Sequence, residues 1–355
     1  MGLSAGPVAP RVRAEIKAGL LELVDHAGRA GWSVRRAADT LGIDHMRVLR
    51  WQQRRAAGRL EDSPAGPDVA VHALLDFERE MIVKLAEEWG GMDRSHRKLA
   101  HRGSRLGWVH VSESTVLRVL DDQGIRLPGS PVREHREKKP FPDWALWRPK
   151  SIWIYDFTHF TAARRCALAV MDLVSRKWIT TLVSAEESSL QVETAFLSAL
   201  HAEDLGHLAE RRMRAELAAP GPPPDEQPVL LAVSDNGPKM RSADTRTFMA
   251  ACLIGQHFGR PHTPNDQAWI ESLFGHVKGE WPHLTKIRDP FELEAELDAV
   301  RTEYNTVRLH AGIGYVTPDD EHTGRADAIR TARTHGLQQA RERRIAYRRK
   351  QGEKF

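Results

Sequence analysis

Apolar residues recur at helical spacing along the first third of the chain. Within residues 11–58 they are spaced for three short helices that share one core. Ser33 and Asp44 are good N-cap residues for the second and third helices, and Gly42 can end the second. The core residues expected here are Ala37, Ala38, Leu41, Ile43, Val48, Leu49 and Trp51. The pattern predicts a helix-turn-helix domain over residues 1–60, although small three-helix domains without DNA-binding activity share it.

The helical pattern returns after residues 61–74, a stretch with Gly, Pro and Asp that is typical of a linker. Three amphipathic helices are predicted within residues 75–128, with Trp108, Val109 and Val111 in a turn or wing. This second helix-turn-helix-like domain has two interpretations. It is either a second head that reads DNA or a domain for dimerisation or docking.

The pattern changes in the middle of the chain. Residues 129–150 are basic and rich in Pro, which predicts an extended linker, lying against phosphates or simply solvated. From Ser151, the runs SIWIYDFTHF, RCALAVMDLV and RKWITTLVS predict an antiparallel meander of three strands. A helix is expected from about Ser188, then a fourth strand, VLLAVS, and mainly helices after about Ser242. This order predicts an α/β layer of the RNase H-like type over residues 151–322.

The last part, residues 323–355, is expected to be a basic helix or a disordered tail. It carries ten Lys and Arg against three Asp and Glu, and residues 1–60 carry eleven against five. The net charge is only +4, so the basic residues are concentrated at the two ends. Such ends suit a polyanionic partner, because Lys and Arg that neutralise phosphates release counterions. A solvated basic surface is the alternative.

Composition narrows the classes of protein further. Cys166 and Cys252 lie in apolar surroundings, as small core residues do, and two cysteines cannot build a disulfide framework. The sequence has neither an apolar signal core nor a run long enough to span a bilayer, so no membrane partner is expected. It has no Gly-x-x-x-x-Gly-Lys-Ser/Thr loop, so ATP hydrolysis is not expected. We expect a cytoplasmic protein.

Two aspartates stand out in the predicted strands. Asp156 lies in a strand whose two alternating sets of side chains are both apolar, so both faces of the strand should be buried. A carboxylate there is costly unless it is paired or binds a metal ion. Asp235 follows the fourth strand and precedes Asn236 and Gly237. Asp-Asn-Gly is also a common turn sequence, so Asp235 alone is a weak signal.

A third acid lies on a helix predicted to begin near Asn265 or Asp266. Glu271 and Lys278 are seven residues apart and therefore lie on one face of that helix, which could also be an ordinary solvated face. Three carboxylates brought together suit Mg²⁺, which prefers oxygen ligands. Two such ions, about 3.5–4 Å apart, can activate a nucleophile and stabilise the leaving oxygen of an in-line displacement.

Five stretches carry a resemblance to a known family. They are WIYDFTHF (153–160), MDLVSRKW (171–178), SDNGPKM (234–240), NDQAWIESLFGHVKGE (265–280) and YNTVRLHAGIGYVTP (304–318), and 35 residues separate Asp235 from Glu271. With these motifs, residues 151–320 resemble the integrase-type catalytic core of DDE-type insertion-sequence transposases, which are related to retroviral integrases. His159 departs from the pattern, because an aromatic residue more often follows the preceding Thr. An insertion rich in Ala, Glu and Arg also lengthens the gap between the first two acids.

The resemblance implies a DNA transposase, a polynucleotidyl transferase and endonuclease that cuts the 3′ ends of an element and joins them to target DNA. The three metal-binding catalytic acids would be Asp156, Asp235 and Glu271, with two Mg²⁺ or Mn²⁺ ions per active site. Lys278 would contact DNA near the scissile phosphate. The partners implied are double-stranded DNA, as terminal inverted repeats and target, and at least a second copy of the chain. A bacterial protein acting at the nucleoid is therefore expected.

Other residues are candidate DNA contacts. They are the arginines of the third helix, Arg47, Arg50, Arg54 and Arg55, and two polar residues beside the acids, Asn236 and Gln267. Several residues are discounted instead: Asp172 as a structural acid, Ser175 as lacking a nucleophile-elbow pattern, and His257, His262 and His310 as exposed loop histidines. Two other functions remain open, namely a catalytically silent DNA-binding regulator derived from a transposase and an RNase H-like nuclease without strand transfer.

Overall fold

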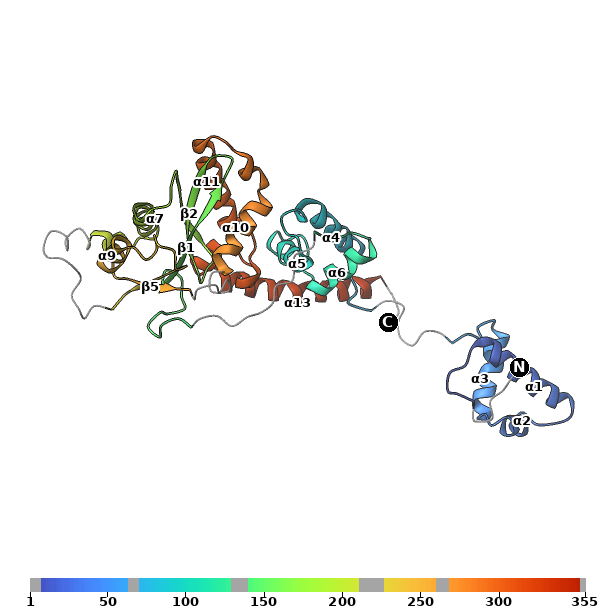
Figure 1. Ribbon diagram of the computed structural model, residues 1–355. Helices are drawn as coiled ribbons and strands as arrows, with labels where there is room; N and C mark the ends of the chain where they lie inside the picture. The colour runs from blue at the N-terminus through green and yellow to red at the C-terminus, as the bar shows by residue number, and fades with distance from the viewer. Residues whose placement is uncertain (1–7, 63–69, 129–139, 211–226, 260–267, 352–355) are drawn as a thin grey trace. The chain divides into compact units, whose positions relative to one another are not determined.

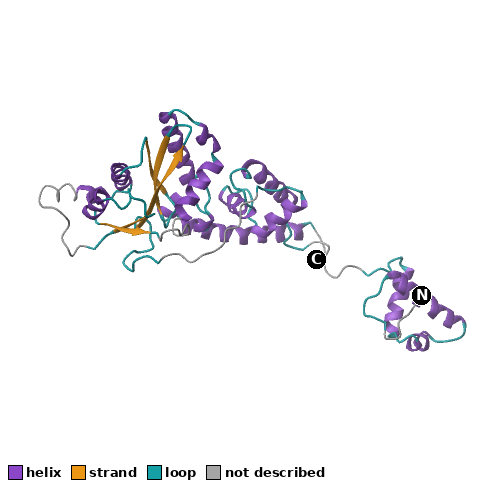
Figure 2. Cartoon of the chain, viewed as in Figure 1, coloured by secondary structure: helices purple, strands orange, loops and turns teal. Residues whose placement is uncertain are grey.

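The computed structural model describes residues 8–62, 70–128, 140–210, 227–259 and 268–351. The chain forms two compact units, Met1–Ala73 with Ile345–Phe355, and Leu74–Arg344. Helices occur in both units, whereas the strands are gathered in one region of the second (Figures 1 and 2). Within the described ranges, none of the helices has the length and apolar character needed to cross a membrane.

The first unit contains the three helices expected from the sequence, α1 (Ala14–Arg29), α2 (Val34–Thr40) and α3 (His45–Ala56). The hydroxyl of Ser33 and the carboxylate of Asp44 accept backbone N–H groups in the first turns of α2 and α3, so both predicted N-caps are present. The core contains the apolar residues Leu20, Leu21, Val24, Ala37, Ala38, Ile43, Val48 and Trp51. Leu49, which was expected there, is exposed instead.

The second unit begins with α4 (Asp76–Trp89), α5 (His96–Arg105) and α6 (Glu113–Asp122). Ser95 and Ser112 cap α5 and α6 in the same way. Val109 and Val111 were expected in a turn or wing. Both side chains are buried in the core between the three helices, so the α5–α6 connection is packed inward.

The sheet has five strands in the order β3-β2-β1-β4-β5. The expected meander is formed by β1 (Ile152–Phe160), β2 (Arg165–Asp172) and β3 (Trp178–Ser184). The fourth strand, β4 (Leu230–Ser234), pairs in parallel with β1. The sequence analysis missed β5 (Ile254–Phe258), which pairs in parallel with β4. Its sequence, IGQHF, is short and contains Gly and two polar residues, so it lacks a clear strand pattern.

Helices cover both faces of the sheet. One layer contains α7 (Ser189–Ala202) and α9 (Ala243–Ala251), and the other contains α10 (Ala268–Glu280) and α11 (Pro290–Thr306) (Figure 1). Two separate apolar clusters fill the spaces between sheet and helices. The mixed α/β core expected from the sequence is therefore present.

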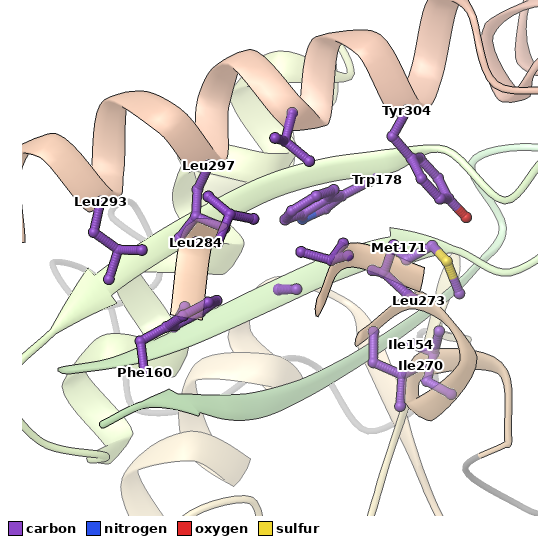
Figure 3. Packing of buried hydrophobic residues seen from close by; sticks show 14 of the residues in the cluster. Ile154, Phe160, Met171, Trp178, Ile270, Leu273, Leu284, Leu293, Leu297 and Tyr304 are labelled. Carbon is purple, nitrogen blue, oxygen red and sulfur yellow. The ribbon is translucent and has the colours of Figure 1, made fainter. Parts of the chain in front are cut away.

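The two clusters divide the residues of β1 by parity. Ile152 and Ile154 belong to the cluster beneath α10 and α11, and Figure 3 shows Ile154 beside Ile270 of α10. Trp153 and Tyr155 belong to the cluster beneath α7 and α9. Since successive side chains of a strand point to opposite faces, this division fixes which layer each residue of β1 faces.

The segment before β1 is part of the core, contrary to the prediction of a linker over residues 129–150. In its described part, residues 140–150, Phe141 packs against the sheet and α10. The Phe141 ring stacks on Trp269 with the ring centroids 6.1 Å apart. Aromatic side chains bury a large apolar area, which outweighs the local effect of the neighbouring prolines. Residues 129–139 lie outside the described residues.

The chain continues through η2 (Pro282–Lys286), η3 (Ala311–Ile313) and α12 (Pro318–His322) to the long helix α13 (Ala326–Lys350). Within the second unit, α13 contacts the α4–α6 domain. Arg333 donates to the Ala100 carbonyl at 2.8 Å, and Arg344 donates to the Glu78 carboxylate at 2.7 Å. These two basic residues of the C-terminal region therefore bind protein groups.

Candidate active site

Asp156 lies on β1 and faces the layer that contains α10. It has the same parity as Ile152 and Ile154, which pack under α10 and α11. One carboxylate oxygen accepts the backbone N–H of Phe157 at 2.8 Å. The side chain is therefore held at the sheet surface, between β1 and the helix above it.

Asp235 follows the last residue of β4, at the sheet edge toward which β1 also runs. The parallel register pairs Ile152 with Leu231 and Ile154 with Val233. Two residues further along both strands, the same register brings Asp235 beside Asp156. The Asp235 carboxylate accepts the N–H of Gly237 at 2.9 Å. The Asp-Asn-Gly sequence thus forms a turn, as its ordinary interpretation predicts, and that turn lies next to Asp156.

Glu271 is in the first turn of α10, and Lys278 fixes its position along β1. Lys278 Nζ donates to the backbone carbonyl of His159 on β1 at 3.1 Å. Glu271 lies two turns before Lys278, about 10 Å back along the helix. Asp156 lies three residues before His159, which is also about 10 Å back along the strand. Because Ile270 lies beside Ile154 (Figure 3), α10 and β1 run in the same sense, and Glu271 lies near Asp156.

The electrostatics of Asp156 agree with this placement. Burial raises its pKa most strongly, and the charges of Asp235, Glu187 and Glu271 raise it further, whereas the hydrogen bond from Phe157 opposes the change. The resulting pKa is about 7. The charges of three other carboxylates therefore act on Asp156, and such repulsion is of the kind that a bound cation relieves.

The donor set fits hard divalent cations in its chemistry, since carboxylate oxygens are the ligands that Mg²⁺ and Mn²⁺ prefer. The side chains are not gathered into a finished coordination shell. Among the residues that the structure describes, no three His, Cys, Asp or Glu side chains are close enough to hold one metal ion. Asp156 and Asp235 each accept a backbone N–H instead. Binding an ion would require their carboxylates to turn toward one another.

Glu187 is a neighbour of the site that the sequence analysis missed. It lies in the loop after β3, and its carboxylate is 3.0 Å from Nε2 of His159 and also pairs with Lys239. In the motif AEESS, a loop glutamate carries no periodic signal. Only the strand order reveals it, because β3 runs in the same direction as β1 and both end at the same edge of the sheet.

Three residues near the acids were predicted to contact DNA, and the structure gives the present contacts of two of them, Lys278 and Asn236. The pKa of Lys278 is lowered by partial burial, and its ammonium group lies 5.3 Å from the centroid of the Phe160 ring. Asn236 donates its side-chain amide to the carbonyl of Gly259, so it also supports the loop after β4. Gln267 lies outside the described residues.

The four arginines of α3 differ in how many hydrogen bonds and ion pairs they form within the protein. Arg47 donates to the carbonyls of Val8, Ala9 and Pro10 and stacks over Trp51. Arg54 and Arg55 form ion pairs with Asp62 and Asp25. Arg50 is exposed and donates only to Met46 of its own helix among the described groups. Of the four, Arg50 is therefore the one that is exposed and forms no ion pair with the described residues.

The residues that the sequence analysis discounted include a buried chain of hydrogen bonds. Asp172 is fully buried and accepts three bonds from Val174 and Ser175, so it is a structural acid as expected. Ser175 also contacts His322, which contacts Glu203 in turn. The side chains of Ser175 and His322 are both buried, so this series of hydrogen bonds stabilises the fold and is not accessible to a substrate.

The expectation that the loop histidines are exposed was wrong for two of them. His257 is in β5 and only 9% exposed, and Phe141 packs edge-on against its ring. Burial and the neighbouring Arg308 hold the pKa of His310 well below its usual range. His262 lies outside the described residues. Cys166 and Cys252 are both buried free thiols, as expected.

Comparison with known proteins adds two sequence matches. Residues 253–318 match the family described as integrase core domain. The chain is also 25% identical, over 175 residues, to the transposase for insertion sequence element IS904 of Lactococcus lactis subsp. lactis. The chain resembles DDE-type insertion-sequence transposases. It spans 61% of the length of that relative, and the alignment covers 48% of this chain.

The integrase core match begins just before β5 and ends at the start of α12. It therefore includes Glu271 and Lys278, but it does not reach Asp156 or Asp235. Among solved structures, the intasome of simian T-cell lymphotropic virus overlaps at a TM-score of 0.38 with 15% identity, covering 67% of this chain and 74% of that chain. The catalytic core domain of BIV integrase overlaps at 0.35 with 20% identity, covering 50% and 97%.

Proposed function

We propose that this protein is a DNA transposase of an insertion sequence. It binds the terminal inverted repeats of its element, cuts at their 3′ ends and transfers those ends to target DNA. Water is the first nucleophile, and the freed 3′-hydroxyl is the second. The protein acts as at least a dimer on DNA, so that two ends are paired, and it works at the bacterial nucleoid.

One observation carries this proposal: three acids distant in the chain are directed to one place. The parallel register of β1 and β4 supports a position of Asp156 beside Asp235. The hydrogen bond from Lys278 to His159 supports a position of Glu271 near Asp156. The direction of the pKa change at Asp156 agrees with this convergence. Asp156 is partly buried, whereas Asp235 and Glu271 are exposed. A carboxylate that is partly removed from water is costly unless it is paired or binds a metal ion.

In the proposed mechanism, Asp156, Asp235 and Glu271 would hold two Mg²⁺ or Mn²⁺ ions. Such ions, when bound, activate the attacking oxygen and stabilise the leaving oxygen at phosphorus. Lys278 lies on the same side of α10 as Glu271 and would bind a phosphate next to the bond that is cut. The apolar packing under α10 holds the helix, and with it both side chains, at a fixed height above the sheet.

DNA recognition is assigned to α3 of the first unit, with Arg50 as the leading contact. The other three arginines would take part only by exchanging their present partners for phosphates. The second domain, α4–α6, is better explained by docking than by reading DNA. Its basic helix α5 uses Arg102 to bind Asp93 and the Val307 carbonyl.

Two other functions make different predictions from the same site. A silent DNA-binding regulator would bind repeat DNA without cutting it, and the presence of all three acids favours the enzyme. An RNase H-like nuclease without strand transfer would cut DNA but yield no joined products. An assay that separates cleaved from joined DNA distinguishes the three.

The test of the proposed chemistry is the variant Glu271→Gln, which keeps the size of the side chain and removes its charge. We expect it to lose Mg²⁺-dependent 3′-end cleavage by a factor of at least about 10². Glu294→Gln, at an exposed position on α11, is the matched control and should cleave normally. Thermal unfolding verifies that both variants are folded. Undiminished cleavage by Glu271→Gln would remove Glu271 from the mechanism.

A further inference from the structure

A hollow of about 300 Å³ lies at the end of the sheet beside the candidate active site. Its walls come from the end of β1, the β1–β2 turn and the loop after β3. The charged residues in these walls are His159, Arg164, Arg165, Glu186 and Glu187. Neither the cleavage chemistry proposed above nor the integrase core match, residues 253–318, assigns a role to it.

The two arginines of the hollow retain most of their capacity to bind an anion. Among the described residues, neither Arg164 nor Arg165 forms an ion pair, and Arg165 donates only to the carbonyl of Arg164 at 3.0 Å. The Glu187 carboxylate, by contrast, is already paired with His159 and Lys239. The hollow therefore offers guanidinium donors whose charge is opposed only by the exposed Glu186.

The backbone at Arg164 supports a role for its side chain. Its φ is +50°, in the left-handed region that glycine adopts at little cost and other residues adopt rarely. The Cβ of an arginine makes this conformation less favourable than it would be for glycine. A non-glycine residue in this conformation is a reason to ask what its side chain does, and the side chain of Arg164 lines the hollow.

The hollow is continuous with the active site through His159. The His159 side chain forms part of its wall, while the carbonyl of the same residue accepts the hydrogen bond from Lys278. His159 is three residues from Asp156, which is about 10 Å along a strand. The phosphates of one DNA strand follow one another about every 3.4 Å along the helix axis, so a strand at the acids can reach the hollow within a few nucleotides.

We propose that this hollow binds a backbone phosphate of the DNA strand in the active site, within a few nucleotides of the bond that is cut. Arg164 and Arg165 are its ligands, since planar guanidinium groups match phosphate oxygens. This inference rests on the proposed function, because it takes its ligand from the same DNA. It adds a second anchor to Lys278 and so fixes the direction of the strand across the acids.

The test compares the full-length protein with the variant Arg164→Ala/Arg165→Ala in binding to the repeat DNA that flanks its own coding sequence. We expect affinity to fall less steeply with salt in the variant, with a log–log slope smaller by about 0.9 for one lost phosphate contact. Arg246→Ala, at an exposed position on α9 in the opposite helical layer, should leave the slope unchanged. Thermal unfolding checks that all three proteins are folded.

A methylphosphonate scan, which neutralises one phosphate at a time, locates the contact. One position near the cleavage site should weaken binding by wild type but not by the double variant. An unchanged salt slope, or a scan in which wild type and variant lose affinity alike at every position, would overturn the hollow as a phosphate site while leaving the proposed function intact. If wild-type protein does not bind repeat DNA at all, the proposed function falls, and this inference falls with it.

Discussion

At the scale of single residues, Asp156 carries the clearest sign of function. Its carboxylate is partly buried, and that burial, with smaller contributions from the charges of three other acids, raises its pKa to about 7. Groups that destabilise a fold in this way persist where function needs them. The sequence analysis found this residue because an acid in a strand with two apolar faces is unusual.

We expect Asp156→Asn to raise the free energy of unfolding by about 1–3 kcal/mol at pH 8 without divalent cations, because it removes a buried charge from among like charges. In wild type, adding Mg²⁺ should raise the unfolding temperature, since a ligand that binds only the folded state stabilises it. The variant should lose most of that response. Urea unfolding with and without Mg²⁺ measures both effects. A variant less stable than wild type under both conditions would show that the carboxylate has a structural partner.

Gly255 in β5 offers a second prediction at this scale. A Cβ built there would lie 2.8 Å from the Trp144 indole, so Gly255→Ala should destabilise the fold by about 1–3 kcal/mol. At Gly275, within α10, no atom of the described residues beyond the neighbouring helix backbone lies within 4 Å of the position that a Cβ would take, and Gly275→Ala should stabilise by up to about 1 kcal/mol. Urea unfolding of the two variants should therefore give effects of opposite sign. Equal effects would mean that Trp144 can move away at little cost.

Other residues at the site could not be found from the sequence. Glu187 reaches the site only because β1 and β3 end at the same edge of the sheet, which is a property of strand order. The short-range pattern around a residue cannot report a contact that depends on how distant strands are arranged. The same reason explains why the hollow near Arg164 was not anticipated.

At the scale of elements, the buried chain from Asp172 to Glu203 links the β2–β3 turn, the end of α7 and α12. Burial alone would raise the pKa of Glu203, but hydrogen bonds from His322 and Lys177 lower it to about 2, below its ordinary value of 4.5. A carboxylate with a lowered pKa stabilises the fold above its unfolded-state pKa. That stability is lost as pH falls through the folded-state value.

We therefore expect wild type to lose about 3 kcal/mol of unfolding free energy between pH 5 and pH 2 through Glu203 alone. Glu203→Gln should be less stable at pH 7 by about 3 kcal/mol or more, because Lys177 and His322 lose a buried partner. Its stability should also change less with pH over that interval. Urea unfolding at a series of pH values gives both curves. Parallel curves for wild type and variant would show that Glu203 is not the group that titrates.

The contact of α13 with the α4–α6 domain depends on Gly336. A Cβ at this position would overlap the His110 ring, so the helix approaches the domain as closely as a glycine permits. Gly336→Leu should force the two apart and lower the unfolding free energy by about 1–3 kcal/mol. Gln339→Ala, at an exposed position of α13, is the control. Hydrogen exchange should become faster around His110 in Gly336→Leu only. Unchanged exchange there would show that the contact does not hold the domain.

Helices and strands could be predicted where they carry a long hydrophobic pattern or a capping residue. They were missed where contacts between distant residues determine the local structure. The three strands of the meander and the capped helices of the first unit carry their own signals. In contrast, β5 is formed because β4 offers it a parallel partner. The segment 140–150 packs against the core because the Phe141 ring stacks on Trp269, which is far from it in the sequence.

At the scale of the whole molecule, the two helical domains differ in the charge of the helices that could bind DNA. In α3 there are four arginines and no acid, whereas α6 carries Glu113, Asp121 and Asp122 against a single Arg118. A helix with this balance of charge is poorly suited to the negative potential of a DNA groove. The α4–α6 domain should therefore contribute little to DNA binding, and recognition should depend on the first unit.

Two arginines in matching surroundings test that division. Arg50 and Arg118 are both exposed, and each donates to the carbonyl four residues before it on its own helix. We expect Arg50→Ala to weaken binding to repeat DNA and to reduce the salt slope by about 0.9 if it contacts a phosphate, or to relax sequence preference if it contacts a base. Arg118→Ala should change neither quantity. Equal losses in the two variants would mean that both helical domains bind DNA, since the substitutions remove the same charge from the same local setting.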